Sequence, residues 1–149
     1  MAASLLNMTP ASKQIFQQLM DSFHQDRVII ETGACHIWHG PVTYVSNKRT
    51  AAYPYKKFRY MVKNDQGQVV RAEKNHYIHH VVYFLRWGKV PVKRLQLEIS
   101  HLCHEPLCVN VDHLFLEPGK TNKNRTLKCV VGAGGYCEGH GDYPDCVFP

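Results

Sequence analysis

The sequence has no long apolar run, no leader-like start and no internal repeat. Because no stretch of roughly 18 apolar residues occurs, we expect no membrane-spanning helix. The opening MAASLLNMTPASKQ lacks a basic segment followed by an apolar core, so we expect no secretory signal. These absences favour an intracellular, reducing location, in the nucleus or the cytoplasm, and they argue against a membrane as partner.

Acidic residues are also scarce relative to basic ones. The 12 Asp and Glu residues stand against 18 Lys and Arg residues, which gives a formal net charge of +6 and a pI near 9.0. A basic excess of this kind favours a polyanionic partner. The length of 149 residues and the hydrophobic content of 44% predict one globular domain over residues 1–149 and exclude long disorder.

Cysteine, in contrast, is well represented, with six residues at positions 35, 103, 108, 129, 137 and 146. Three disulfides would be expected in a secreted chain, but in a reducing compartment thiols persist or bind metal. Several histidines lie among the last five cysteines. We therefore expect zinc, which cysteine thiolates and histidine nitrogens bind together.

Local patterns predict helices and short strands. Thr9 followed by Pro10 is typical of a helix N-cap and first turn, and apolar residues then recur at helical spacing over residues 10–25. Between Val28 and Val45, β-branched and aromatic residues interrupted by glycines and a proline indicate short strands. The segment NHYIHHVVYFLRWG, residues 75–88, predicts a core helix that stops at its glycine.

The remaining segments predict further short elements. Two strand-like runs over residues 53–73 flank the turn Asn64–Gly67, which indicates a β-hairpin. Residues 95–103 indicate a strand, and residues 110–127 a turn and a short helix. The Gly-rich tail has little apolar periodicity and needs a staple to fold. The expected fold class is a small zinc-stapled α+β fold with short antiparallel sheets.

The tail itself supplies a complete ligand set. Four residues form a Cys3His group within 18 positions: Cys129, Cys137, His140 and Cys146. The alternative is a loop with incidental cysteines, but nothing apolar in this segment could order its backbone. We therefore expect a C-terminal zinc loop over residues 129–146.

The stretch SHLCHEPLCVNVDHL, residues 100–114, supplies three further ligands: Cys103, Cys108 and His113. A structural zinc site needs a fourth ligand. Cys35 is the only cysteine left, although its neighbours His36 and His39 are alternatives. With Cys35 included, two Cys3His sites use every cysteine, and the formal charge falls from +6 to +4 because each zinc site carries a charge of −1.

The same stretch, followed by KTNKNR, resembles the motif of the His-Cys box homing endonucleases, which are ββα-metal or His-Me finger nucleases. That motif reads SHLCH, then places a second cysteine, a zinc histidine and an asparagine at fixed distances. The positions that match are Ser100, His101, Leu102, Cys103, His104, Cys108, His113 and Asn122. The resemblance runs roughly from residue 35 to residue 146 and implies a ββα-metal core over residues 100–125.

The resemblance also implies a set of catalytic residues. His101 would be the general base, Asn122 would hold one Mg²⁺ ion through its amide oxygen, and Arg71 would contact the phosphate. Arg71 is assigned because it stands ten residues before the pair Val81 and Val82. Other interpretations are a helix N-cap or turn role for Asn122 and a solvated strand charge for Arg71. For His104, which belongs to neither ligand set, we expect a solvent-facing or core position.

The predicted hairpin has a basic face, because basic residues alternate with apolar ones along its first strand. A two-stranded ribbon fits the major groove of DNA. The residues that we expect to contact double-stranded DNA are Lys57, Arg59, Lys63, Gln66 and Gln68. The alternative is a solvated strand face without a partner.

Together these features predict a Mg²⁺-dependent DNA endonuclease with two structural zinc ions. The alternatives are a zinc-stabilised DNA-binding protein without cleavage activity and a protein-interaction module whose charge is incidental. His101 and Asn122 at motif spacing favour the nuclease. The chain stops three residues after Cys146 and so lacks the subunit-swapping tail of the family. We therefore expect a weak or DNA-dependent homodimer.

Overall fold

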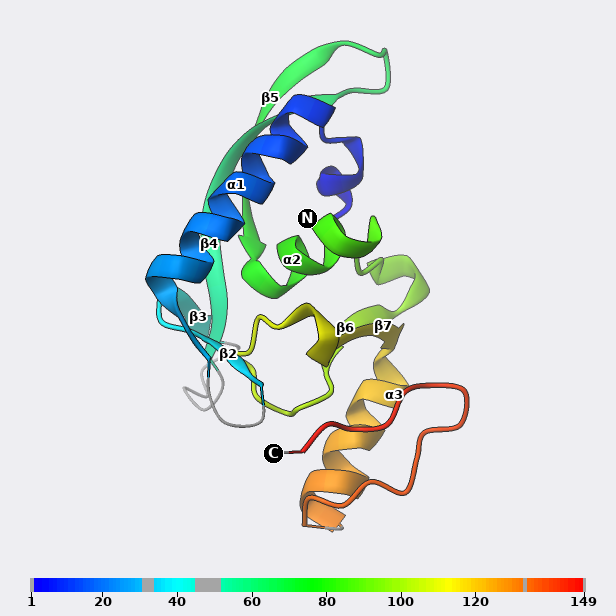
Figure 1. Ribbon diagram of the computed structural model, residues 1–149. Coiled ribbons are helices and arrows are strands. Elements are labelled where there is room, and N and C mark those ends of the chain that lie inside the picture. Colours follow the sequence, from blue (N-terminus) through cyan, green and yellow to red (C-terminus); the bar gives the residue numbers. More distant parts are fainter. Residues whose placement is uncertain (1, 31–33, 45–51, 133, 149) are drawn as a thin grey trace.

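The computed structural model describes residues 2–30, 34–44, 52–132 and 134–148 (Figure 1). In chain order its main elements are α1 (Pro10–Arg27), β1 (Val28–Ile30), β2 (His36–Trp38), β3 (Val42–Tyr44), β4 (Ala52–Lys63), β5 (Val69–Tyr77), α2 (Ile78–Trp87), β6 (Leu97–His101), β7 (Leu114–Pro118) and α3 (Gly119–Asn124). Short 3-10 turns lie at Ala2–Asn7, Lys93–Leu95 and Val111–His113, and a π-helical segment, η4, covers Arg125–Gly132. The sheets pair as β1–β2, β3–β4–β5 and β6–β7, all antiparallel. The predicted α+β class with short antiparallel sheets is confirmed.

Helix α1 begins as the sequence predicts and supplies one side of the core. The Thr9 side chain accepts a hydrogen bond from the backbone N–H of Ser12 at 3.3 Å, and Pro10 occupies the first helical position. The apolar face of α1 packs on β4, where the rings of Phe16 and Phe58 lie 4.9 Å apart. In Figure 1 the helix follows the length of the β4–β5 ribbon. No helix in the described ranges combines the length and the apolar character that a membrane span requires.

The β4–β5 pair occupies the range expected for a hairpin and extends beyond it at both ends. Its ladder runs from Lys63 opposite Val69 to Tyr55 opposite Tyr77. At the tip, Gly67 adopts a left-handed φ of 77°. Residues 75–77 were expected in a helix, but they continue β5 because they pair with residues 55–57. Helix α2 therefore starts at Ile78 and ends at Trp87, and Gly88 caps its C-terminus, as expected.

The second hairpin and the helix that follows it form a ββα unit (Figure 1). Strand β6 lies within the range predicted for a strand, and it pairs with β7 from Leu97 opposite Pro118 to His101 opposite Leu114. The local pattern over residues 110–127 did not indicate strand β7, whereas the ββα-metal core that the resemblance implies over residues 100–125 includes a second strand. After η4 the chain returns, and the N–H of Val147 donates to the carbonyl of Leu102 at 2.8 Å.

The expected strands over residues 28–45 are found as β1, β2 and β3, while residues 31–33 and 45 lie outside the described part.

Candidate metal centres and active site

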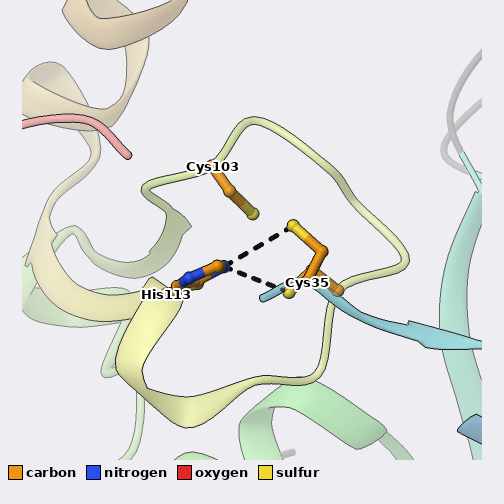
Figure 2. A group of neighbouring side chains, drawn as sticks. Cys35, Cys103 and His113 are labelled. Atoms are coloured by element: carbon orange, nitrogen blue, oxygen red, sulfur yellow. Dashed lines mark hydrogen bonds between the residues drawn. The ribbon is translucent and has the colours of Figure 1, made fainter. Parts of the chain in front are cut away.

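The first group of metal-ligating side chains combines three segments of the chain, and its members are Cys35, Cys103, Cys108 and His113. Their ligand atoms all lie within 4.8 Å of one another. The Sγ atoms of Cys35 and Cys108 are each 3.6 Å from Nδ1 of His113 (Figure 2). Zinc bonded tetrahedrally to sulfur at about 2.3 Å and nitrogen at about 2.0 Å gives S···N edges of about 3.5 Å. The donor set therefore fits one structural zinc ion.

Strand β2 brings Cys35 to this group. The strand docks on the loop that carries the other ligands, because the N–H of Trp38 donates to Leu107 at 2.9 Å and the N–H of Val109 donates to His36 at 2.8 Å. The alternative ligands lie elsewhere. The His36 ring packs against the ring of His24 at 4.8 Å, and His39 is exposed.

The second group lies in the C-terminal loop, and its members are Cys129, Cys137, His140 and Cys146. Nε2 of His140 is 3.4 Å from the sulfur of Cys129 and 3.3 Å from that of Cys146. Backbone N–H groups of Gly139 and Cys146 donate to the sulfur of Cys137. The two S···N distances are close to the separation of about 3.5 Å between sulfur and nitrogen ligands of a tetrahedral zinc ion, so this set fits a second zinc ion. Within the described ranges no third group of this kind occurs.

A buried ionic network joins the second group to the β6–β7 hairpin. Nε and Nη2 of Arg125 each lie 2.7 Å from a carboxylate oxygen of Glu117, and Ser100 also donates to this carboxylate. Nη1 of Arg125 points to the sulfur of Cys146 at 3.6 Å. The two charged side chains are 1% and 0% exposed. The network thus connects Ser100, the residue before His101, to Cys146 of the C-terminal metal group.

His101 ends β6 and belongs to neither metal group. Burial lowers the pKa of its imidazole to about 4, whereas a hydrogen bond to the backbone of Cys108 raises that pKa. A hydrogen bond that raises the pKa of a histidine favours the protonated ring, so the ring donates to the Cys108 carbonyl. Among the described residues, Nε2 of His101 has no hydrogen-bond partner. The donor is therefore Nδ1, and Nε2 is the atom left to accept a proton.

Asn122, on α3, lines a groove of about 1250 Å³ and a smaller pocket of about 390 Å³. The residues that line both are Tyr53, Tyr77, His80, Pro91, Glu98 and Asn122. His101 itself lines neither cavity. Its ring centre lies 4.6 Å from that of His79 and 6.1 Å from that of Tyr53, and both of these residues line the smaller pocket. Asn122 thus lines the smaller pocket directly, whereas His101 contacts the rings of Tyr53 and His79, which line it.

Arg71 is not brought to this pocket. It lies opposite Met61 on the exposed face of the β4–β5 hairpin and lines neither cavity. Arg71 lies six positions along β5 from Tyr77, which lines both cavities, and six steps of extended chain span about 20 Å. His104, for which we expected a solvent-facing or core position, is half-buried with its ring stacked on that of Phe148.

The exposed face of the hairpin carries the expected basic residues. Lys57, Arg59 and Lys63 share it with Arg71, because directly paired residues point to the same side of a sheet. Glu73 partly neutralises the face, since its carboxylate lies 3.1 Å from Lys57 and 2.7 Å from Arg59. This face is continuous with the groove, whose walls include Tyr55, Asn75 and Tyr77 from the same side of the two strands.

The hairpin tip carries the two expected glutamines. Gln66 is exposed, and the side chain of Gln68 accepts a hydrogen bond from Asn64 at 3.1 Å. The Asn64 side chain also accepts from the backbone N–H groups of both glutamines.

Comparison with known proteins gives one family. The sequence model of the zinc-binding loop region of homing endonuclease matches residues 41–138, more than half of the chain. No curated protein matches the sequence. The matched range contains five of the eight metal-ligating residues and the whole ββα unit.

Proposed function

Because the chain belongs to the family of the zinc-binding loop region of homing endonucleases, we propose that it is a DNA endonuclease that hydrolyses a phosphodiester bond in double-stranded DNA. Its general base is His101, its divalent ion is one Mg²⁺ held by Asn122, and its two zinc ions are structural. The observation that carries the proposal is the state of the His101 ring. One nitrogen is held by the Cys108 backbone, and the other has no partner.

A general base needs a fixed ring and a free nitrogen lone pair. The hydrogen bond to the Cys108 carbonyl supplies the first, and the unpartnered Nε2 supplies the second. Because burial keeps the pKa low, the ring is neutral near pH 7. When substrate is bound, Nε2 takes a proton from a water molecule whose oxygen attacks phosphorus, and the bond to the leaving oxygen of the sugar breaks. Because Nε2 is buried, the groups packed around the His101 ring must shift before that water can reach it.

Asn122 offers a hard oxygen ligand beside the same pocket. An amide oxygen suits Mg²⁺, which keeps several waters and binds substrate phosphate through the rest of its shell. When bound there, Mg²⁺ would neutralise charge on the phosphate and on the leaving oxygen. The amide nitrogen of Asn122 is occupied by Glu98, so the oxygen is the atom available to the ion.

The first metal group stabilises the loop that orients His101. Cys108 is both a ligand of the first metal group and the residue whose backbone orients His101. A metal bound there would fix the loop that carries the carbonyl. Since each group has four protein ligands, neither site has an open position for water, and the zinc ions have no direct part in hydrolysis.

The β4–β5 hairpin supplies the DNA surface in this proposal. Lys57, Arg59, Lys63 and Arg71 lie on its exposed face, with Gln66 and Gln68 at the tip. Because this face leads into the groove beside Asn122, bound DNA would pass from the hairpin to the pocket. Arg71 then contacts a phosphate that flanks the cleavage position. Such contacts fix the register of the duplex.

One active site per chain cuts one strand, so double-strand cleavage requires two copies. We propose a homodimer that is weak or depends on DNA, acting in the nucleus or the cytoplasm, where DNA is present.

The proposal is tested with purified protein, supercoiled plasmid and Mg²⁺. We expect conversion to nicked and linear DNA in buffer that contains Mg²⁺, no conversion after dialysis into Mg²⁺-free buffer without chelator, and renewed conversion when Mg²⁺ is added back. Protein that binds the plasmid but leaves it supercoiled, with both zinc ions present, would support the alternative of a DNA-binding protein without cleavage activity.

A further inference from the structure

Glu98 lies beside Asn122 in a contact that the sequence motif does not include. The Asn122 amide nitrogen donates to Oε2 of Glu98 at 2.8 Å, and both residues line the groove and the smaller pocket. An ionised carboxylate can only accept hydrogen bonds, so the contact identifies which end of the amide is the nitrogen. The Asn122 oxygen is therefore the free end.

The start of α3 is shaped around the Glu98 carboxylate. A Cβ atom at Gly119 would lie 2.8 Å from Oε1 of Glu98, so a larger residue at this position would displace the carboxylate. The backbone N–H of Gly119 donates to the carbonyl of Gln96 at 2.8 Å, which ties the first residue of α3 to the chain just before β6. Glu98 is thus held between the helix and the pocket.

Glu98 also changes the electrostatic environment that a cation would meet in the cavity. Among the described residues that line the groove and the pocket, Glu98 is the only acidic one, and the groove also contains Lys93, Lys120 and Lys123. A divalent cation held only by a neutral amide would meet a positive environment there. One carboxylate a few ångströms away changes the sign of the nearest charge.

We propose that Glu98 is a positioning residue for the divalent ion of the active site. It turns the Asn122 amide so that the oxygen is offered to the ion, and it supplies the negative charge that the amide lacks. This inference rests on the proposed function, because it concerns the same ion. It adds a residue from β6 to the histidine and asparagine that the family motif supplies.

The test is a Mn²⁺ titration followed by the NMR signals of the Asn122 side-chain amide, in wild type and in Glu98→Gln, Glu98→Ala and Asp26→Asn. In wild type, Mn²⁺ should broaden these signals selectively. Glu98→Gln keeps an acceptor oxygen but removes the charge, so about tenfold more Mn²⁺ should be needed. Glu98→Ala removes both, so the Asn122 signals should also shift before any metal is added. Asp26→Asn removes one carboxylate from the exposed surface of α1 and should match wild type.

Broadening of Glu98→Gln at the wild-type Mn²⁺ concentration would overturn the inference, as would unshifted Asn122 signals in metal-free Glu98→Ala. Plasmid nicking separates this failure from failure of the proposed function. A wild-type protein that does not nick defeats the nuclease proposal, and the Mn²⁺ titration still decides on Glu98. A wild-type protein that nicks, with Glu98→Gln showing the same Mg²⁺ requirement, defeats the Glu98 inference alone.

Discussion

Replacing Arg125 with Met should destabilise the protein far more than the same replacement at Arg59. Each guanidinium group lies 2.7 Å from a glutamate, but the Arg125–Glu117 side chains are 1% and 0% exposed, whereas the Arg59–Glu73 side chains are 64% and 41% exposed. Loss of Arg125 leaves the Glu117 carboxylate desolvated and without its cation, which costs about 3–5 kcal/mol. The exposed pair is screened by water and contributes little.

Thermal unfolding followed by circular dichroism measures the difference, with zinc content determined for every variant. For a chain of this length, the loss at Arg125 corresponds to a melting temperature lower by about 10 °C. Arg59→Met should melt close to wild type. A double variant, Glu117→Leu with Arg125→Met, should recover part of the loss because it leaves no unpaired buried charge.

Two results would refute this reasoning. One is Arg125→Met melting together with Arg59→Met. The other is a double variant less stable than Arg125→Met, which would mean that the unpaired carboxylate is not the source of the loss.

Three further predictions concern metal, pH and assembly. Metal analysis should give two zinc ions per chain. Because a structural zinc contributes about 10–16 kcal/mol to folding, chelation should unfold at least the C-terminal loop. One zinc or none in folded protein, or disulfides detected by mass spectrometry, would contradict this prediction. Burial lowers the pKa of His76 from 6.5 to about 4, so the unfolded chain binds the extra proton first, and His76 should contribute at most about 3 kcal/mol to the loss of stability as pH drops from 6.5 towards 4. His76→Phe should reduce this slope in urea titrations at several pH values, and an unchanged slope would exclude His76 as a source. Analytical ultracentrifugation should show monomer at nanomolar concentration without DNA and dimer on a cleavable duplex; a stable dimer without DNA is the opposing result.

Local signals in the sequence predict the elements whose boundaries depend on a few neighbouring residues. Thr9 and Pro10 start α1 as expected, because an N-cap and a first-turn proline act within one helical turn. The hairpin tip follows from Asn64 and Gly67 in the same way. The cysteine count similarly anticipates two groups of four ligands, since two Cys3His groups use all six cysteines.

Features set by packing between distant segments could not be predicted in this way. Arg71 was assigned by its distance from Val81, counted along the chain, but β5 stays extended up to Tyr77 and carries Arg71 away from the pocket. The Arg125–Glu117 pair was missed because charged residues are expected at the surface. Glu98 reaches Asn122 only because α3 folds back against β6, and no local pattern encodes that contact.

The central claim is that His101 takes a proton from water and holds no zinc, and plasmid nicking by His101→Ala tests it most directly. The control is His39→Ala, which removes an exposed imidazole outside both metal groups. Zinc content, DNA affinity and melting temperature are measured on the same samples. We expect His101→Ala to retain two zinc ions and wild-type DNA affinity while nicking falls by roughly 10²–10⁴-fold, and His39→Ala to nick as wild type does. A fully active His101→Ala variant, or an inactive one that has lost a zinc ion, would contradict the account.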